Sequence, residues 1–159
     1  MTTSNDLIDA LRSAPGFGGL DEGRLAALAR IASLSSVAAD GAIFEEDARE
    51  GDLFFLISGI AELRMRAPGG KNSMDDAIAP VKAGEFTGET AFLDGGRREA
   101  GLYARDRCLA LRIDGPALKR LCEADAELGR AVYAALGRVS AGRYRDAAIE
   151  LRNAQRGTY

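Results

Sequence analysis

The chain of 159 residues is 47% hydrophobic, which supplies enough apolar material for one domain with one core. Its 21 basic and 24 acidic residues give a formal net charge of -3, so we do not expect a surface built mainly for nucleic acid. Histidine is absent, which excludes a histidine-bearing catalytic triad and a histidine metal centre. No run approaches the roughly 20 apolar residues of a membrane span, and the polar N-terminus is no secretory signal, so we expect a cytoplasmic protein.

Two short helices are predicted in the first part of the chain, residues 1–33. Asn5 or Asp6 is expected to cap the first helix, which ends before Pro15. The second helix is expected to begin at Asp21, because apolar residues follow Asp21 at helical spacing.

Short apolar runs separated by glycine turns follow in residues 34–113 and predict the antiparallel strands of a β-roll or jelly roll. The run 53–57 is apolar on both faces, so we expect a strand buried between two layers. Pro80 lacks a backbone N–H and therefore places its strand at a sheet edge. The runs 99–105 and 108–113 are expected to form a hairpin.

The last part of the chain, residues 114–159, predicts two more helices. Asp114 is expected to cap the first, and the longer second helix begins near Asp125. The apolar seam of that second helix changes register near residues 140–142, which predicts a hinge there. From Arg152 onward the chain is polar and is expected to fray.

Two further features carry no predicted function. The segment 67–73 is rich in glycine and polar residues and is expected to be a mobile hairpin tip. Cys108 and Cys122 are spaced neither as a CxxC pair nor as a disulfide framework, so we expect two reduced thiols in the core.

The densest group of chemically informative residues lies in the segment 84–104, GEFTGETAFLDGGRREAGLYA. Gly88 can bring the backbone close to a ligand, and the five residues after it can form one helical turn whose free N–H groups attract a phosphate. Arg98 follows this turn, and its planar guanidinium suits a phosphodiester. Glu89 can then accept hydrogen bonds from a sugar hydroxyl.

This segment resembles the phosphate-binding cassette of the cyclic-nucleotide-binding domains, the family of the catabolite activator proteins, the regulatory subunits of protein kinase A and the cyclic-nucleotide-gated channels. The matching residues are Gly88-Glu89, Ala91-Phe92-Leu93 and Arg98-x-Ala100. The run 51–59 is also similar to a recurrent Gly-Asp-x-x-Phe-x-Ile-x-x-Gly pattern of the family. The resemblance implies a single α+β, mainly β, domain: an antiparallel β-roll or jelly roll with N-terminal helices and two C-terminal helices.

The resemblance also implies a ligand, cAMP or cGMP, and the residues that would bind it. The cyclic-nucleotide-binding residues would be Phe86, Gly88, Glu89, Thr90, Ala91, Arg98, Glu99 and Ala100. The last helix of the family can fold over the ligand, so the contacts with the base would come from Arg138, Arg143 and Tyr144. The plain alternatives are a surface arginine at Arg98, paired with Glu89 or Glu99, and a solvated face on the last helix.

Glu99 departs from the family, which usually has threonine, serine or alanine after the arginine. A carboxylate ~4 Å from a cyclic phosphate would cost about 4 kcal/mol, or roughly a thousandfold in affinity. If Glu99 and Arg98 diverge, as neighbours in a strand do, little affinity is lost. If Glu99 instead points inward, it could pair with Arg98 and replace the ligand, leaving a degenerate domain that serves as a protein–protein or dimerisation module.

The function implied by the resemblance is a stand-alone regulatory sensor and not an enzyme. It would need no covalent or metal cofactor. No DNA-binding module is visible after the last helix, so an unidentified protein effector would read the sensor, or the chain is one piece of a longer protein. A homodimer through the C-terminal helix is one form that this output could take.

Overall fold

The computed structural model describes residues 4–66 and 76–157, so the predicted hairpin tip at 67–73 lies outside the described residues. The helices are α1 (Ser4–Ser13), α2 (Glu22–Ala29), α3 (Glu89–Asp94), α4 (Gly115–Ala124) and α5 (Ala126–Arg156). The strands are β1 (Ala32–Val37), β2 (Ala42–Phe44), β3 (Leu53–Ser58), β4 (Ile60–Met65), β5 (Asp76–Lys82), β6 (Phe86–Thr87), β7 (Gly101–Ala104) and β8 (Cys108–Ile113).

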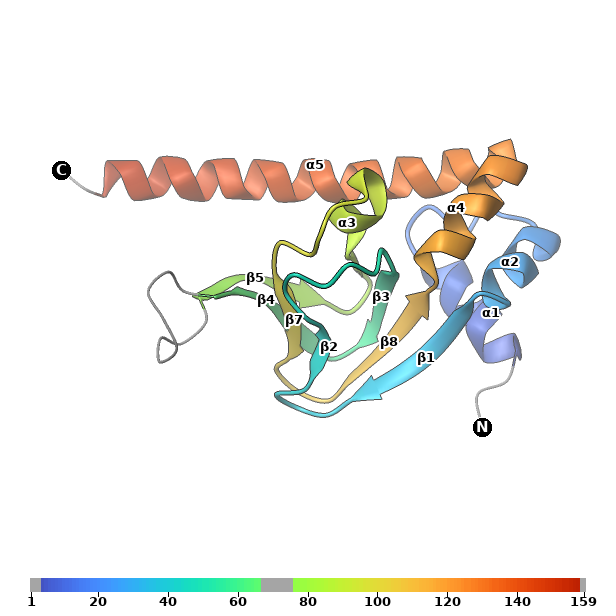
Figure 1. Cartoon of the computed structure of the whole chain (residues 1–159), viewed down its shortest axis with the longest axis horizontal. Helices are drawn as coiled ribbons and strands as arrows, with labels where there is room; N and C mark the ends of the chain where they lie inside the picture. The colour runs from blue at the N-terminus through green and yellow to red at the C-terminus, as the bar shows by residue number, and fades with distance from the viewer. Residues whose placement is uncertain (1–3, 67–75, 158–159) are drawn as a thin grey trace.

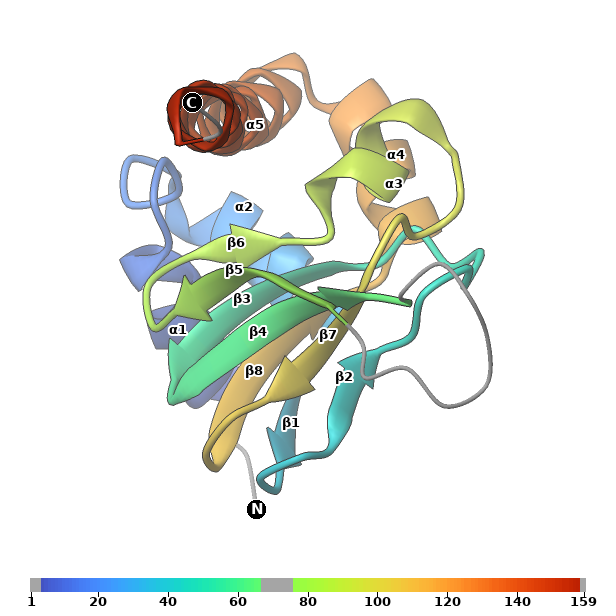
Figure 2. The ribbon, with the colours of Figure 1, turned by 90° about the vertical axis from the view of Figure 1, so that its left-hand side faces the viewer.

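The strands form two four-stranded antiparallel sheets, with the orders β1-β8-β3-β6 and β2-β7-β4-β5. Helices α1, α2 and α4 gather at one end of this roll, and α5 runs along one side of it and past the β4-β5 pair (Figure 1). Figure 2, which views α5 almost end-on, shows β6 beneath that helix. The predicted α+β architecture, a β-roll with helices before and after it, is confirmed. Within the described residues, no helix is both long and apolar enough to cross a membrane.

Strand β3 separates two hydrophobic clusters. Because successive side chains of a strand point to opposite faces, Leu53 and Phe55 pack toward the helices while Phe54 and Leu56 point into the roll. None of the four is more than 5% exposed. The expectation of a strand buried on both faces is confirmed, and the single predicted core is divided in two by this strand.

The predicted hairpin of residues 99–105 and 108–113 is wrong. Strand β7 begins only at Gly101 and pairs with β2 and β4, whereas β8 pairs with β1 and β3 in the other sheet. Leu102 and Ala110 are both buried in the interior of the roll. Packing the two strands face to face buries apolar side chains from both, which pairing them edge to edge would not achieve.

The edge position predicted for the strand of Pro80 is confirmed. Among the described strands, β5 is the last of its sheet and pairs with β4 alone, where Pro80 lies opposite Glu62. An edge strand tolerates proline because one of its sides has no ladder partner that would need the missing N–H.

Three of the predicted helix starts are confirmed and one is wrong. Asp21, Asp114 and Asp125 are N-caps whose carboxylates accept hydrogen bonds from the backbone N–H groups of the first turn. Asn5 and Asp6 are not caps, because α1 already includes Ser4 and both residues lie in its first turn. The acidic side chain of Asp6 is still favourable there because it faces the positive end of the helix dipole.

Helix α5 shows neither the predicted hinge at residues 140–142 nor the predicted fraying from Arg152. It continues without a break for 31 residues to Arg156, and the N–H of Gly157 bonds to the carbonyl of Asn153. The change of register moves the apolar side chains around the helix to its solvent-facing side, but it does not interrupt the backbone hydrogen bonds. Side-chain periodicity alone is therefore a poor guide to breaks in a helix.

Cys122 leads to a prediction about pH. The residue is 7% exposed, and burial raises the pKa of its thiol to about 11. The folded state thus holds the thiol proton more tightly than the unfolded state, whose thiol has a pKa of about 8.5. We expect the stabilisation from this group to be complete below about pH 8.5 and to decline as the pH rises toward 11. Urea unfolding at pH 7.5 and pH 10 should therefore show a smaller loss of stability for Cys122→Ala than for the unchanged chain, and an equal loss would contradict the prediction.

Candidate functional site

The turn that the sequence predicts after Gly88 is present as α3. Gly88 precedes the helix in the left-handed conformation, with a φ of 83°. A Cβ atom there would lie 2.5 Å from Nη1 of Arg98 and 3.0 Å from the carbonyl oxygen of Asp52. Glycine is therefore required both by the backbone angle and by the close approach of these two groups.

Arg98 is one of the largest fully buried side chains, with 2% of its surface exposed. Its Nη1 donates to the carbonyl oxygen of Gly88 at 3.2 Å, and its Nη2 donates to the carbonyl oxygen of Asp52 at 2.6 Å. The guanidinium carbon lies 4.2 Å from the ring centroid of Phe44 and 5.6 Å from that of Phe54. The plain alternative of a surface arginine paired with Glu89 or Glu99 is wrong.

The charge of Arg98 is poorly balanced by the protein. Within the described residues, its Nε has no hydrogen-bond partner, and the one carboxylate within 4.0 Å of the guanidinium is that of Glu50, whose side chain is 45% exposed. Burial lowers the pKa of Arg98 below its ordinary value, because desolvation disfavours the charged form of the guanidinium. The buried carboxylates of Asp52 and Glu89 act on Arg98 only from beyond 4.0 Å. A buried cation without a buried carboxylate in direct contact is an electrostatic basis for binding an anion.

Asp52 is a site residue that the sequence analysis did not select. Its carbonyl oxygen accepts from Arg98, while its carboxylate, 3% exposed, pairs with Arg112 and accepts from the N–H of Gly115 at 2.9 Å. The Gly-Asp pattern in the run 51–59 was the available signal, but nothing in it indicated a link to an arginine 46 residues later. Asp52 connects the guanidinium of Arg98 to the start of α4.

Glu89 is also buried, and its partner comes from α5. Its side chain is 3% exposed, and Oε2 accepts a hydrogen bond from Nη1 of Arg143 at 2.5 Å. Nη2 of Arg143 donates to the carbonyl oxygen of Phe86 at 2.8 Å. The long helix is thereby bonded at two points to the segment that the sequence predicts as a cassette.

The predicted site residues divide into those near the cassette interior and those on the surface. Phe86, Ala91 and Ala100 are buried beside Gly88, Glu89 and Arg98, whereas Thr90 and Glu99 are exposed. Of the three residues of the last helix predicted to contact the base, Arg143 contacts the cassette, Arg138 lines a cavity beneath α5, and Tyr144 is 76% exposed.

Glu99 does not point inward and does not pair with Arg98, as one of the alternatives from the sequence required. Residues 98 to 100 alternate between buried, exposed and buried, so the carboxylate of Glu99 turns outward while Arg98 and Ala100 turn inward. This divergence is present although residues 99 and 100 form a bend and β7 begins only at Gly101.

A cavity of about 730 Å3 lies between α5 and the β5 side of the roll. Its lining includes Ile78 and Pro80 of β5 and Arg138, Arg143 and Asp146 of α5. Because Arg143 also bonds to Glu89, it lies between this cavity and the cassette. The volume is within the range of small-molecule sites.

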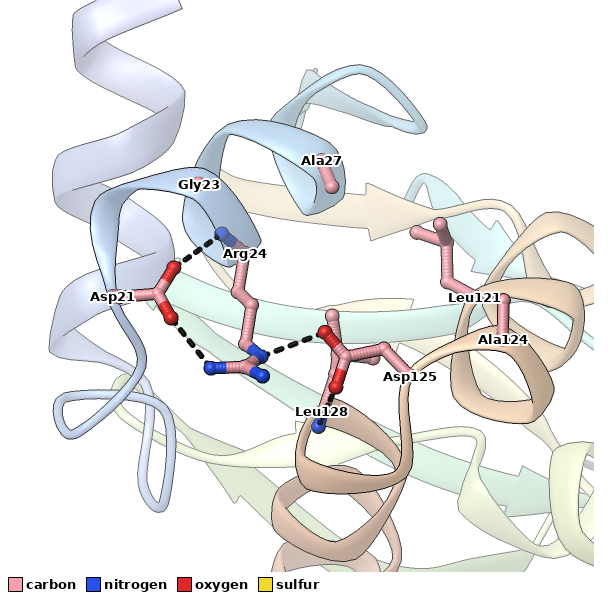
Figure 3. Close-up of a pocket in the computed structure, with 8 residues that line it drawn as sticks. All are labelled: Asp21, Gly23, Arg24, Ala27, Leu121, Ala124, Asp125 and Leu128. Atoms are coloured by element: carbon pink, nitrogen blue, oxygen red, sulfur yellow. Dashed lines mark hydrogen bonds and ion pairs between the residues drawn. The ribbon is translucent and has the colours of Figure 1, made fainter.

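A second cluster fixes the beginning of α5. Arg24 of α2 donates from Nε to Asp125 at 2.7 Å, and its Nη1 lies 2.5 Å from Asp21 and 2.7 Å from Glu127. Figure 3 shows Arg24 between Asp21 and Asp125 at the wall of a cavity of about 340 Å3. The hydrogen bond from Arg24 lowers the pKa of Asp125 below its ordinary value. The N-terminal helices are thus joined to the start of the helix whose middle reaches the cassette.

The chain matches several solved structures of the same fold. A cyclic nucleotide-binding domain from Methylobacillus flagellatus is 20% identical, with a TM-score of 0.77 and coverage of 94% of this chain and 83% of that one. The N-terminal domain of a transcriptional regulator from Streptomyces coelicolor is 25% identical, with a TM-score of 0.66 and coverage of 88% and 95%. The regulatory subunit of a cAMP-independent protein kinase A from Trypanosoma brucei, as a mutant with cAMP bound in its A site, is 19% identical, with a TM-score of 0.72 and coverage of 92% and 51%.

The search among curated proteins gives no match. The profile of the family described as "Cyclic nucleotide-binding domain" matches residues 34–125, which is more than half of the chain and includes the cassette. The chain therefore belongs to the cyclic nucleotide-binding domain family.

Proposed function

We propose that the chain is a regulatory domain that binds a cyclic nucleotide, cAMP or cGMP, in the cassette and transmits the binding to α5. The observation that carries this proposal is the buried guanidinium of Arg98, which is 2% exposed and, within the described residues, has no buried carboxylate within 4.0 Å. A cyclic phosphate carries a single negative charge and the oxygen atoms that a guanidinium binds well. The proposed ligand would be held by hydrogen bonds and charge, so no metal or covalent cofactor is needed.

The residues next to Arg98 would hold the rest of the ligand. Glu89 would accept a hydrogen bond from a ribose hydroxyl, as the family resemblance suggests, because it lies one residue after Gly88 at the start of α3. The cavity beneath α5 would leave room for the base. The mutant of the Trypanosoma brucei regulatory subunit, which has the same fold and holds cAMP in its A site, supports this choice of ligand class only as an example of the fold with cAMP bound.

Phe92 is the residue best placed to transmit binding to the last two helices. Its side chain is fully buried, its ring centroid lies 6.1 Å from that of Tyr133 on α5, and Nζ of Lys119 on α4 lies 5.3 Å from its centroid. Leu93, the next residue of α3, is 41% exposed and therefore packs less tightly against the other helices. A shift of α3 toward a ligand would therefore displace Tyr133 of α5 through its contact with Phe92.

Isothermal titration calorimetry tests the proposal directly. The purified chain would be titrated with cAMP, cGMP and, as a matched control, 5′-AMP, which keeps the base and sugar but has an open phosphate. Saturable heat with a cyclic nucleotide and a clearly weaker response to 5′-AMP supports the proposal. The absence of a heat of binding with either cyclic nucleotide at millimolar concentration contradicts the proposal.

Glu99→Thr is expected to change the affinity for the cyclic nucleotide by less than about threefold. The carboxylate of Glu99 is exposed, and water and salt screen its charge from the cassette. Titration of both proteins at the same ionic strength measures the difference. A gain of tenfold or more would mean that the carboxylate faces the ligand after all.

A second candidate function is a module that binds another protein through α5. The observation in its favour is that Tyr144 is 76% exposed and Leu151 is 62% exposed on this helix, although aromatic and aliphatic side chains of this size favour burial. A second copy of the chain is the partner that the sequence suggests. Sedimentation equilibrium is expected to show a dimer of the unchanged chain and a monomer of Leu151→Glu. A monomer of the unchanged chain at all concentrations would contradict the homodimer.

A further inference from the structure

Arg143 lies at the point where α5 leaves the body of the protein. The buried residues of the helix end at Leu136, and Arg143 is partly buried with 31% of its side chain exposed. From Tyr144 to Gly157 every residue is exposed. The cavity of about 730 Å3 lies beneath this part of the helix, so apolar packing contributes little to holding it against the roll.

We infer that Arg143 is an internal competitor for Glu89, so that α5 must give up this ion pair before a ribose hydroxyl can take its place. The inference rests on the proposed function, since it concerns the carboxylate to which that function assigns the ribose. The two hydrogen bonds of Arg143, to Oε2 of Glu89 and to the carbonyl oxygen of Phe86, are the contacts that would be broken.

The chemistry of the two donors favours Arg143 in the absence of other contacts. The guanidinium is a cationic donor, and hydrogen bonds between charged groups are roughly twice as strong as neutral ones. A ribose hydroxyl is neutral and cannot compensate the charge of a carboxylate that is 3% exposed. The sugar alone would therefore lose the competition, and the attraction of the cyclic phosphate to Arg98 has to supply the difference.

The competition couples ligand binding to the position of α5. When the ligand takes Glu89, the helix loses its bonds to the cassette, while its beginning stays fixed by Arg24 and Asp125. The far part of α5 is then free to move or to meet a partner. By reciprocity, a partner that holds α5 away from the roll would increase the affinity for the nucleotide by the same factor.

The experiment compares Arg143→Gln with Arg145→Gln in the full chain. Arg145 is an exposed arginine on the same helix two residues away, so its variant removes the same charge without touching the cassette. Amide hydrogen exchange of residues 138–150 without ligand is expected to be about tenfold faster in Arg143→Gln than in the other two proteins. Equal exchange in all three proteins would mean that Arg143 does not hold the helix and would overturn the inference.

Titration with cAMP and cGMP gives the second readout. The affinity of Arg143→Gln is expected to rise about tenfold over that of Arg145→Gln, because the competitor is gone. A fall in affinity would overturn the inference, since Arg143 would then belong to the ligand site instead of competing with it. If none of the three proteins binds, the proposed function fails along with the competition, and the exchange rates alone report whether Arg143 holds α5.

Discussion

Arg98→Lys should lower the affinity for the cyclic nucleotide by about a hundredfold or more. The lysine keeps the charge but loses the planar fork that reaches two carbonyl oxygens and the face of Phe44 at once. Losing a buried, hydrogen-bonded charge contact costs about 3 kcal/mol, which corresponds to more than a hundredfold in the dissociation constant. Titration calorimetry with cAMP and cGMP measures the change.

The matched control is Arg97→Gln, which alters the adjacent arginine. Arg97 is exposed, and its Nη1 donates a long hydrogen bond of 3.3 Å to the carbonyl oxygen of Asp47. Its variant should bind nearly as the unchanged chain does. Thermal unfolding of both variants is needed, because Arg98 also supports the fold and only a folded Arg98→Lys protein tests the site. Unchanged affinity in a folded Arg98→Lys protein would show that the guanidinium does not contact the phosphate.

Gly88→Ala should reduce the free energy of unfolding by about 2 to 5 kcal/mol. A left-handed backbone angle costs a residue with a Cβ roughly 1 to 2 kcal/mol, and overpacking a closed site costs roughly 1 to 3 kcal/mol more. Both apply at Gly88, whose φ is 83° and whose added Cβ would lie 2.5 Å from Nη1 of Arg98. Because Arg98 must move, cyclic-nucleotide binding should be lost as well.

Gly95→Ala separates the two contributions. Gly95 also has a left-handed angle, with a φ of 72°, but a Cβ there would meet no atom within 4 Å. Its variant should lose only the backbone part, roughly 1 to 2 kcal/mol, and should keep its ligand affinity. Urea unfolding of the two variants measures the difference. Equal losses would mean that Gly88 does not lie as close to Arg98 as the structure places it.

Local patterns were sufficient for the elements and for the inward-facing part of the cassette. The unbroken apolar run 53–57 predicted a strand buried on both faces, because successive side chains of a strand point to opposite faces. Asp21, Asp114 and Asp125 marked helix starts in the sequence, and Asp114 was recognisable as a cap, since a cap bonds to residues two or three positions away. The glycine before α3 and the arginine after it were also visible in the sequence.

Contacts between distant parts of the chain were not visible in the same way. Sequence patterns placed β7 and β8 in one hairpin, but apolar packing across the roll assigns them to different sheets. The register change in α5 suggested a hinge, but a helix needs only its backbone hydrogen bonds to continue.

By itself, the sequence determined that this is a β-roll domain with a glycine, a glutamate and an arginine in the pattern of the family's phosphate-binding cassette. Only the tertiary structure decided that Arg98 bonds to the carbonyl of Asp52 and that Glu89 is paired with Arg143, residues 46 and 54 positions apart in the chain. The physical reason is that the local pattern specifies which way a side chain faces within its own element. The packing of whole helices and sheets specifies what it meets there.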